Sequence, residues 1–201
     1  MGRKLPNHLR NNIFEQVTND YLLHLAKTVL GEIDLDPASS EKANEYVGAK
    51  HYFTAKDDPI NSAKWYGRVY LFPPSHTYFW HRQTSRWKVT RGLSTTLISG
   101  SALWWQTLKR KWINGEVKEA IYMSNQIDIV LYCQDIFDHP VCILNKRPKL
   151  DRIYPDGMIE EAVPTGTCVV VYLHDTSDIS KVEEKTNLFI DTYSEAGRVI
   201  I

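Results

Sequence analysis

Segments with a strand pattern and segments with a helix pattern alternate along this chain, and that alternation limits the folds open to it. Apolar residues recur at helical spacing over 19–31, where Asn19 is the expected N-cap and Gly31 the end of the helix. Strands alternating with helices predict an α/β fold built on a mostly parallel, doubly wound sheet. Further helices are expected over about 39–46, 101–113 and 178–195, and strands over about 33–36, 67–72, 118–124, 141–144, 168–173 and 198–201.

The length of 201 residues suits one domain, so residues 1–201 are expected to form a single unit with 1–12 as a flexible N-terminal segment. The start of the chain lacks the apolar stretch of a signal peptide, and the longest apolar run, 168–173, is far shorter than the roughly 20 residues that cross a bilayer. We therefore expect a cytoplasmic or other intracellular protein without a membrane partner. The cysteines form no CxxC pair and are expected to be core thiols rather than disulfides or metal ligands: Cys133, Cys142 and Cys168.

Two of the expected strands end in unusual turns, Asp34-Leu35-Asp36-Pro37 and Phe72-Pro73-Pro74-Ser75. In open α/β sheets, ligands bind beyond the carboxyl ends of the strands, so these two turns are expected to form one shared site. Carboxylates at such a turn favour a ligand that presents an ammonium group or hydroxyls rather than phosphates. Phosphate cradles of the GxGxxG and GxxxxGK[ST] types are absent from the sequence. The alternative is that these residues form ordinary turns and helix caps.

Charge is unevenly distributed although Lys+Arg and Asp+Glu both number 24. Residues 76–118 carry eight cations and one acid, for a net charge of +7, and the remainder of the chain carries −7. Five of the six tryptophans lie in the same segment. Cations that neutralise phosphates, interleaved with aromatic rings that hold unstacked bases, are typical of nucleic-acid contacts. The alternative is a solvated helix face beside a tryptophan-rich core, and Trp104 and Trp112 are expected to be core residues.

Several motifs follow one another in a characteristic order. A helix is followed by LDPAS, ANEYVGAKHYFT, an acidic pair and WYGRVYLFPPS, and later segments read NGEVKEAIYMSN, PVCILNKR and TYSEAGRVI. Over about residues 13–201, this order resembles the phage-type (Dam-like) DNA adenine-N6 methyltransferase family. That family has D-P-A-x, A-N-x-x-V-x-A-x-x-Y-F-T, an acidic pair, W-x-G-x-V-F and a catalytic N-P-P-Y.

The resemblance implies a Rossmann-like S-adenosylmethionine-dependent methyltransferase fold, S-adenosylmethionine as the cofactor, no metal, and transfer of a methyl group to the exocyclic amine of a flipped adenine in DNA. For a phage-encoded protein the location would be the host cytoplasm. The cofactor-binding residues that it implies are Asp34, Asp36, Pro37, Ala38, Tyr52, Phe53, Asp57 and Asp58. The catalytic positions are Phe72, Pro73, Pro74 and Ser75. Residues 76–100 are the candidate DNA-contacting loop, with Arg82, Arg86, Trp87, Lys88 and Arg91 as the expected contacts.

The catalytic tetrapeptide departs from the family pattern at both ends. Phe72 stands where the family has a hydrogen-bonding Asn or Asp, and Ser75 stands where it has an aromatic ring. Loss of one such polar group typically lowers a rate by about 10²–10³-fold. Two alternatives therefore stay open beside an active adenine methyltransferase. One is a weak or inactive relative that acts as a DNA- or cofactor-binding module or as a partner methyltransferase subunit. The other is an enzyme that methylates a different amine.

Overall fold

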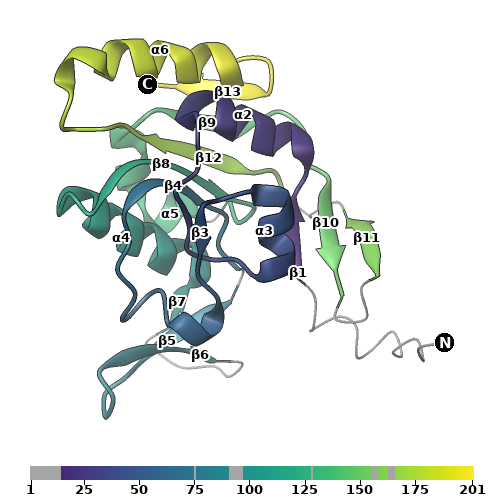
Figure 1. The fold of residues 1–201 in the computed structure, drawn as a ribbon, viewed down its shortest axis with the longest axis vertical. Helices are drawn as coiled ribbons and strands as arrows, with labels where there is room; N and C mark the ends of the chain where they lie inside the picture. The colour runs from purple at the N-terminus through teal and green to yellow at the C-terminus, as the bar shows by residue number, and fades with distance from the viewer. Residues whose placement is uncertain (1–14, 75, 91–96, 128, 155–157, 163–165) are drawn as a thin grey trace.

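The protein is described here by a computed structural model that covers residues 15–201 except 75, 91–96, 128, 155–157 and 163–165. Figure 1 shows a central sheet with one smaller sheet at the bottom of the view and another at the right. The central sheet has the order β13 (Gly197–Ile200), β9 (Val141–Leu144), β12 (Val169–Leu173), β8 (Val117–Ser124), β4 (Gly67–Leu71), β2 (Leu35–Asp36), β3 (His51–Tyr52). The smaller sheets are β1 (Glu15–Thr18), β10 (Leu150–Ile153), β11 (Ile159–Ala162), and β6 (Arg86–Thr90), β5 (Thr77–His81), β7 (Leu97–Ser99).

The expected Rossmann-like, mostly parallel doubly wound sheet is wrong. Among the described strands, seven of the ten neighbouring pairs are antiparallel, and the parallel pairs are confined to β3, β2, β4 and β8. The reason lies between β9 and β12. This segment contributes strands β10 and β11 instead of a crossover helix, so the chain re-enters the central sheet in the opposite direction. The molecule is a mixed α/β protein with three sheets.

The predicted helices form. The sequence predicts the N-cap of the first helix at Asn19 and that of the second at Ser39 or Ser40, and the structure has Asn19 and Ser40. Helix α2 (Asp20–Leu30) begins where the Asn19 side chain accepts a hydrogen bond from the Leu22 amide at 3.1 Å, and it ends at Gly31. Helix α3 (Glu41–Val47) is capped by Ser40 in the same way. The remaining helical segments are α4 (Gly100–Ile113), α5 (Ile129–Tyr132) and α6 (Val182–Tyr193), with short 3-10 turns η1 (Ala55–Asp57), η2 (Gln134–Asp138) and η3 (Ile179–Lys181). Within the described residues, no helix is both long enough and apolar enough to span a membrane.

Apolar side chains form a separate core on each face of the central sheet. Because side chains alternate along a strand, Leu71 joins the core beneath α4, and its neighbour Tyr70 joins the core beneath α2 and α6. Figure 1 shows α2 and α6 together at the top of the view. All three cysteines are buried and free, as the sequence predicts. Burial raises the pKa of the Cys142 and Cys168 thiols to about 12, so both stay protonated and unreactive at neutral pH.

One histidine is buried without a hydrogen bond. The ring of His139 lies against the indoles of Trp105 and Trp112, with centroids 5.9 and 5.2 Å away. Neither ring nitrogen has a partner in the part of the chain that the structure describes. Burial and, to a smaller extent, the nearby Lys109 ammonium lower the pKa of His139 to about 4. At neutral pH this side chain therefore behaves as an uncharged aromatic ring.

Acid is expected to destabilise the protein through His139. As pH falls from about 6.5 to about 4, the unfolded chain takes up a proton at this position that the folded chain refuses, and this lowers the free energy of unfolding by about 3 kcal/mol. In His139→Phe this contribution should disappear, so the stability of the variant relative to the natural chain should rise as pH falls. The measurement is urea unfolding at pH 4.5 and pH 7, with His24→Gln as a control because His24 is exposed on α2. An unchanged pH dependence in His139→Phe would contradict this account.

Candidate functional site

The carboxyl ends of the parallel strands bring together several of the residues predicted from sequence. Strands β3, β2, β4 and β8 run in one direction, so their ends lie along one edge of the sheet, which we name the carboxyl edge. The chain passes from β2 to β3 on one side and then to β4 on the other, so the strand order reverses between Asp36 and Phe72. The Phe53 amide donates to the Asp36 carbonyl at 2.9 Å, and the Ser39 amide donates to the Phe53 carbonyl at 2.9 Å. The turn after β2 and the segment after β3 thus form one surface.

Asp36 is a buried carboxyl group at the centre of this edge. Its side chain is 4% exposed and accepts a hydrogen bond from the Ala38 amide at 3.0 Å and another from Ser39. No cation pairs with it among the described residues, and burial raises its pKa to about 6. Burial raises the pKa of the Tyr70 hydroxyl, and the negative charge of Asp36 raises it as well. The same hydroxyl forms a hydrogen bond with Thr18. A desolvated carboxylate of this kind is electrostatically suited to a cationic ligand group.

The segment Phe72-Pro73-Pro74 leaves β4 next to Asp36. Phe72 is partly buried and packs against the core beneath α2 and α6, while Pro73 is buried. The Pro74 carbonyl accepts a hydrogen bond from the His76 amide at 2.9 Å. Ser75 lies outside the described residues. The side chain of Phe72 therefore supplies packing at the position where the resembled family has a hydrogen-bonding group.

Gly100, the first residue of α4, is in close contact with this segment. A Cβ atom at Gly100 would lie 2.5 Å from the Pro74 carbonyl oxygen and 2.6 Å from the His76 carbonyl oxygen. Both are backbone atoms, so they cannot move aside by rotating a side chain. Only glycine allows the start of α4 to approach the loop after β4 this closely.

Gly100→Ala is expected to lower the free energy of unfolding by about 1–3 kcal/mol, because the new methyl group forces the loop after β4 away from α4. Urea unfolding measures the loss. Gly166→Ala is the matched control, since its Cβ would meet its nearest neighbour, the Asn125 carbonyl oxygen, at an ordinary 3.5 Å. Equal stability of the two variants would show that the close approach does not constrain the loop.

Asp34 lies at the opposite edge from Asp36, although the sequence places them two residues apart. Its carboxylate pairs with the Arg68 guanidinium at 3.0 Å and with the Lys50 ammonium at 3.1 Å. These hydrogen bonds, the Arg68 one foremost, hold the pKa of Asp34 far below its usual range. Asp34 precedes β2, and its partners lie at the starts of β4 and β3. Its contacts join the amino ends of three strands, and it takes no part in the carboxyl edge.

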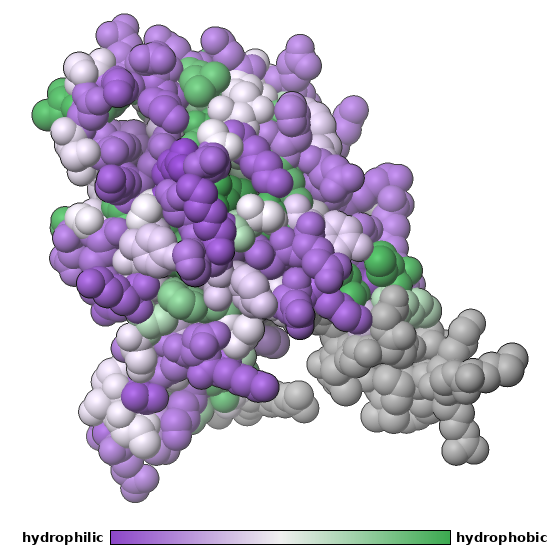
Figure 2. Space-filling view, viewed as in Figure 1, coloured by the Kyte–Doolittle hydropathy of each residue, from purple (hydrophilic) through white to green (hydrophobic). Residues whose placement is uncertain are grey.

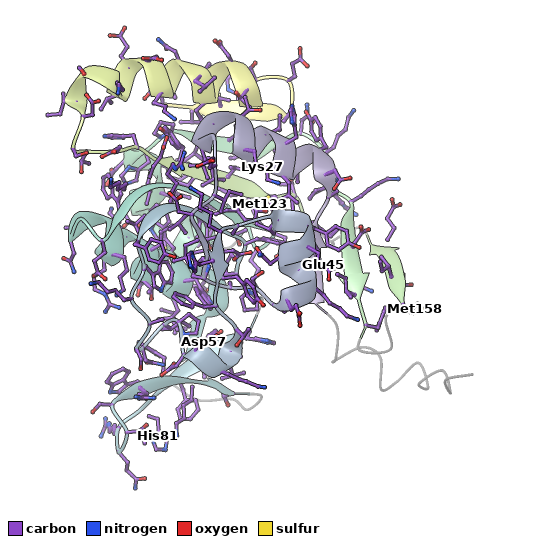
Figure 3. All side chains as sticks on the ribbon, in the orientation of Figure 1. Lys27, Glu45, Asp57, His81, Met123 and Met158 are labelled. Carbon is purple, nitrogen blue, oxygen red and sulfur yellow. The ribbon has the colours of Figure 1, made fainter. Side chains whose placement is uncertain are left out.

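The carboxylates of Asp57 and Asp58 both bind other residues of this chain. Asp57 completes a capping box with Thr54, accepting from its amide at 2.7 Å and its hydroxyl at 2.8 Å. Asp58 accepts from the Asn61 amide group at 2.6 Å and pairs with the Arg86 guanidinium at 2.9 Å. An expected cofactor ligand and an expected DNA contact therefore bind each other. In Figure 3, Asp57 lies between the central sheet and the small sheet that carries His81.

The segment expected to be a DNA-contacting loop contains the sheet β6-β5-β7, which we name the arm. Arg82 and Lys88 are exposed on it, Trp87 packs against the core beneath α4, and Arg91 lies outside the described residues. On the adjacent helix, Lys109 pairs with Asp135 at 2.7 Å, and Lys111 with Glu116 at 2.8 Å. The positive charge predicted from sequence is thus partly neutralised both on the arm, where Arg86 pairs with Asp58, and on α4, and it stays exposed at Arg82 and Lys88.

Sequence reasoning missed the polar residues that follow β8. Ser124 ends this strand at the carboxyl edge and accepts from the Gln126 amide at 3.1 Å, while the Gln126 side chain accepts from the Ser101 hydroxyl at 2.8 Å. These contacts fasten the edge to the start of α4. The sequence signal here was weaker, since Ser124 ends a predicted strand but neither a carboxylate nor a proline follows it, unlike the turn at Asp36.

Two surface hollows lie at the edge opposite the carboxyl edge, where the parallel strands begin; we name it the amino edge. One of about 290 Å³ is lined by residues that include Lys27, Glu32 and Lys50, and one of about 180 Å³ by residues that include Glu119 and Lys185. Glu119 is already paired with Lys185 at 3.0 Å, and Lys50 with Glu32 at 2.7 Å. In the described ranges, no group of three or more His, Cys, Asp or Glu side chains is placed to hold a metal ion.

Comparisons of this chain with protein-family models, curated proteins and solved structures give no match.

Proposed function

We propose that this protein is an S-adenosylmethionine-dependent DNA methyltransferase that acts on the exocyclic amine of adenine. The proposal rests on the motif resemblance and on one observation, the position of the buried Asp36 carboxyl beside the Phe72-Pro73-Pro74 segment where the strand order reverses. Parallel strands whose carboxyl ends meet at such a reversal commonly provide a ligand site. The mixed sheet elsewhere in the molecule leaves this local arrangement intact.

The residues at this edge fit the chemistry of the cofactor. S-adenosylmethionine carries a sulfonium and an ammonium group, and the Asp36 carboxylate would hold a cationic part of it, helped by the loss of competing water. Tyr52 and Phe53 are partly exposed beside Asp36 and would stack on the adenine ring. When bound, the cofactor supplies the methyl group.

The loop after β4 would position the target amine. Rigid proline residues fix the direction of the backbone, and the Pro73 carbonyl would accept a hydrogen bond from the adenine amine. That carbonyl would hold the amine toward the methyl group that the bound cofactor supplies, and the methylated amine would release its extra proton to solvent. Phe72 accepts no hydrogen bond, so transfer should be slower than with an amide at this position.

Binding and transfer can be tested separately. S-adenosylmethionine at a hundredfold excess over its dissociation constant should raise the melting temperature by about 5–10 °C. Labelled methyl groups should pass to DNA that contains adenine and not to DNA that lacks it. Asp191→Asn, an exposed substitution on α6, is the control that should retain both properties. The proposal fails if a known methyltransferase is active in the same assay and this protein neither binds the cofactor nor transfers methyl groups.

The packing of Phe72 into the core favours one second candidate, a binding module that retains the cofactor and DNA surfaces without transferring methyl groups. The double variant Phe72→Asn, Ser75→Tyr separates the two functions. A transfer rate that is absent in the natural chain and appears in this variant supports the module. A natural chain that already transfers methyl groups excludes it.

A further inference from the structure

The arm combines aromatic and basic residues without acidic ones. Residues 77–90 include three cations and no Asp or Glu. Four aromatic rings lie in the same stretch: Tyr78, Phe79, Trp80 and Trp87. Figure 2 shows the arm at the lower left as a purple and pale surface with little green, and Figure 3 shows His81 near its far end. Tyr78 is buried and Trp87 packs against the core beneath α4, so Phe79 and Trp80 are the rings that the arm presents to solvent.

Two tryptophans on the arm form a pair. Trp87 is held by hydrogen bonds to its backbone, and Trp80 is exposed to solvent. Trp80 and Trp87 are directly opposite across β5 and β6, with ring centroids 5.4 Å apart and planes at 67°. The side chain of Asn61 binds both the amide of Trp87 at 2.8 Å and its carbonyl at 3.2 Å. Trp80 stays 42% exposed. A large ring in a fixed position, with much of its surface in water, is a ready stacking partner.

The arm joins the body of the protein at the candidate site. β5 begins three residues after Pro74, and β7 ends at Ser99, directly before Gly100. Thr77 and Ser99 are paired across the base of the arm. The close packing of Gly100 against Pro74 then fixes that base to the loop after β4. A strand of nucleic acid bound along the arm would therefore lead to the carboxyl edge.

We infer that the arm binds an unpaired DNA strand, with a base stacked on Trp80 and a phosphate near Arg82 in the turn after β5, so that the substrate of the proposed methyltransferase is adenine in single-stranded DNA. This inference rests on the proposed function for the reaction, and on the arm alone for binding. An exposed indole gains from stacking only where the face of a base is free, and in a duplex the neighbouring base pairs cover those faces. Arg86 is already paired with Asp58, so the cation that remains near Trp80 is Arg82, and one cation suits a short contact with one backbone.

Binding to fluorescein-labelled oligonucleotides, measured by anisotropy without methyl donor, tests the inference. We use one adenine-containing 20-mer as a single strand, the same sequence as a duplex, and its RNA counterpart. The single strand should bind at least ten times more tightly than the duplex. Trp80→Ala should weaken single-strand binding by roughly five-fold to a hundred-fold, the range for loss of one stacked base. Binding should also weaken as salt is raised.

Val89→Ala is the matched control, because Val89 is 51% exposed on the same face of the arm but has no ring. It should change affinity less than two-fold. Equal effects of the two substitutions, or a duplex bound as tightly as the single strand, would overturn the inference. Equal binding of RNA supports stacking and extends the ligand class, whereas binding of RNA alone overturns the choice of DNA. Single-strand binding without methyl transfer would refute the proposed reaction and leave the arm's role standing.

Discussion

Trp65→Ala is expected to lower the free energy of unfolding by about 3–5 kcal/mol, a large share of the 5–15 kcal/mol that stabilises a typical domain. Trp65 is fully buried in the core beneath α4, where its ring lies 6.1 Å from that of Trp104. Its indole nitrogen donates to the Pro59 carbonyl at 2.9 Å. The substitution removes this packing and leaves a buried carbonyl oxygen without its partner, so two separate costs add.

Urea unfolding of three proteins measures this effect: the natural chain, Trp65→Ala and Trp80→Ala. The last is a matched control, because the same side chain is removed from an exposed site on the arm. We expect Trp80→Ala to lie within about 0.5–1 kcal/mol of the natural chain. Similar losses in both variants would mean that the arm is part of the cooperative core, contrary to the description given above.

Asp36→Asn is expected to stabilise the protein at neutral pH and to abolish cofactor binding. Burial raises the pKa of Asp36 to about 6 in the folded chain, against an ordinary value near 3.8. Below pH 4 the carboxyl is protonated in both states. Between about pH 4 and 6 the unfolded chain loses its proton first, so the stability of the natural chain falls as pH rises, by about 2–3 kcal/mol in all. Above pH 6 the free-energy cost of burying the ionised carboxylate is constant. Asn at this position carries no charge and does not have that cost.

Binding should follow the opposite trend with pH. A cationic cofactor group is attracted to the ionised carboxylate, so its affinity should rise from pH 5 to about pH 7 and then level off. Calorimetry with S-adenosylmethionine across this range measures the trend, and Asp36→Asn should show no binding at any pH. His139 imposes a stability slope of opposite sign in part of the window, so stabilities are compared in the His139→Phe background. A less stable Asp36→Asn that still binds the cofactor would refute the role given to Asp36.

Local signals in the sequence predicted most of the central elements. The caps at Asn19 and Ser40 and the turn after β4 depend on neighbouring residues, so a reading of the chain alone can locate them. Strand direction depends on contacts between distant segments. The alternation of helix and strand patterns along the chain suggested a parallel sheet, and only the pairing of β12 with both β8 and β9 shows that the chain reverses there.

The candidate site was predicted only in part, because some of its residues are marked by local signals and others depend on contacts with distant residues. Asp36 and the loop after β4 were found because each ends a strand at a proline. Asp34 and Asp36 look equivalent in the sequence, yet one forms ion pairs at the amino edge and the other is buried at the carboxyl edge. Partners such as Arg68, 34 residues away, decide between them. The contact of Asp58 with Arg86 likewise joins residues 28 apart that local patterns had assigned to different ligands.

The paired ends of the arm have a consequence for how the molecule can change over time. Because Thr77 and Ser99 are neighbours, the chain leaves the body and returns to it at almost the same point. Arg86 and Trp87 hold β6 to Asp58 and Asn61, so the turn between β5 and β6, residues 82–85, is the part that can be lengthened, shortened or exchanged while β4 and α4 keep their places. The specificity of such a protein can therefore diverge through one exchangeable insert, under separate selection from the edge where the chemistry would occur.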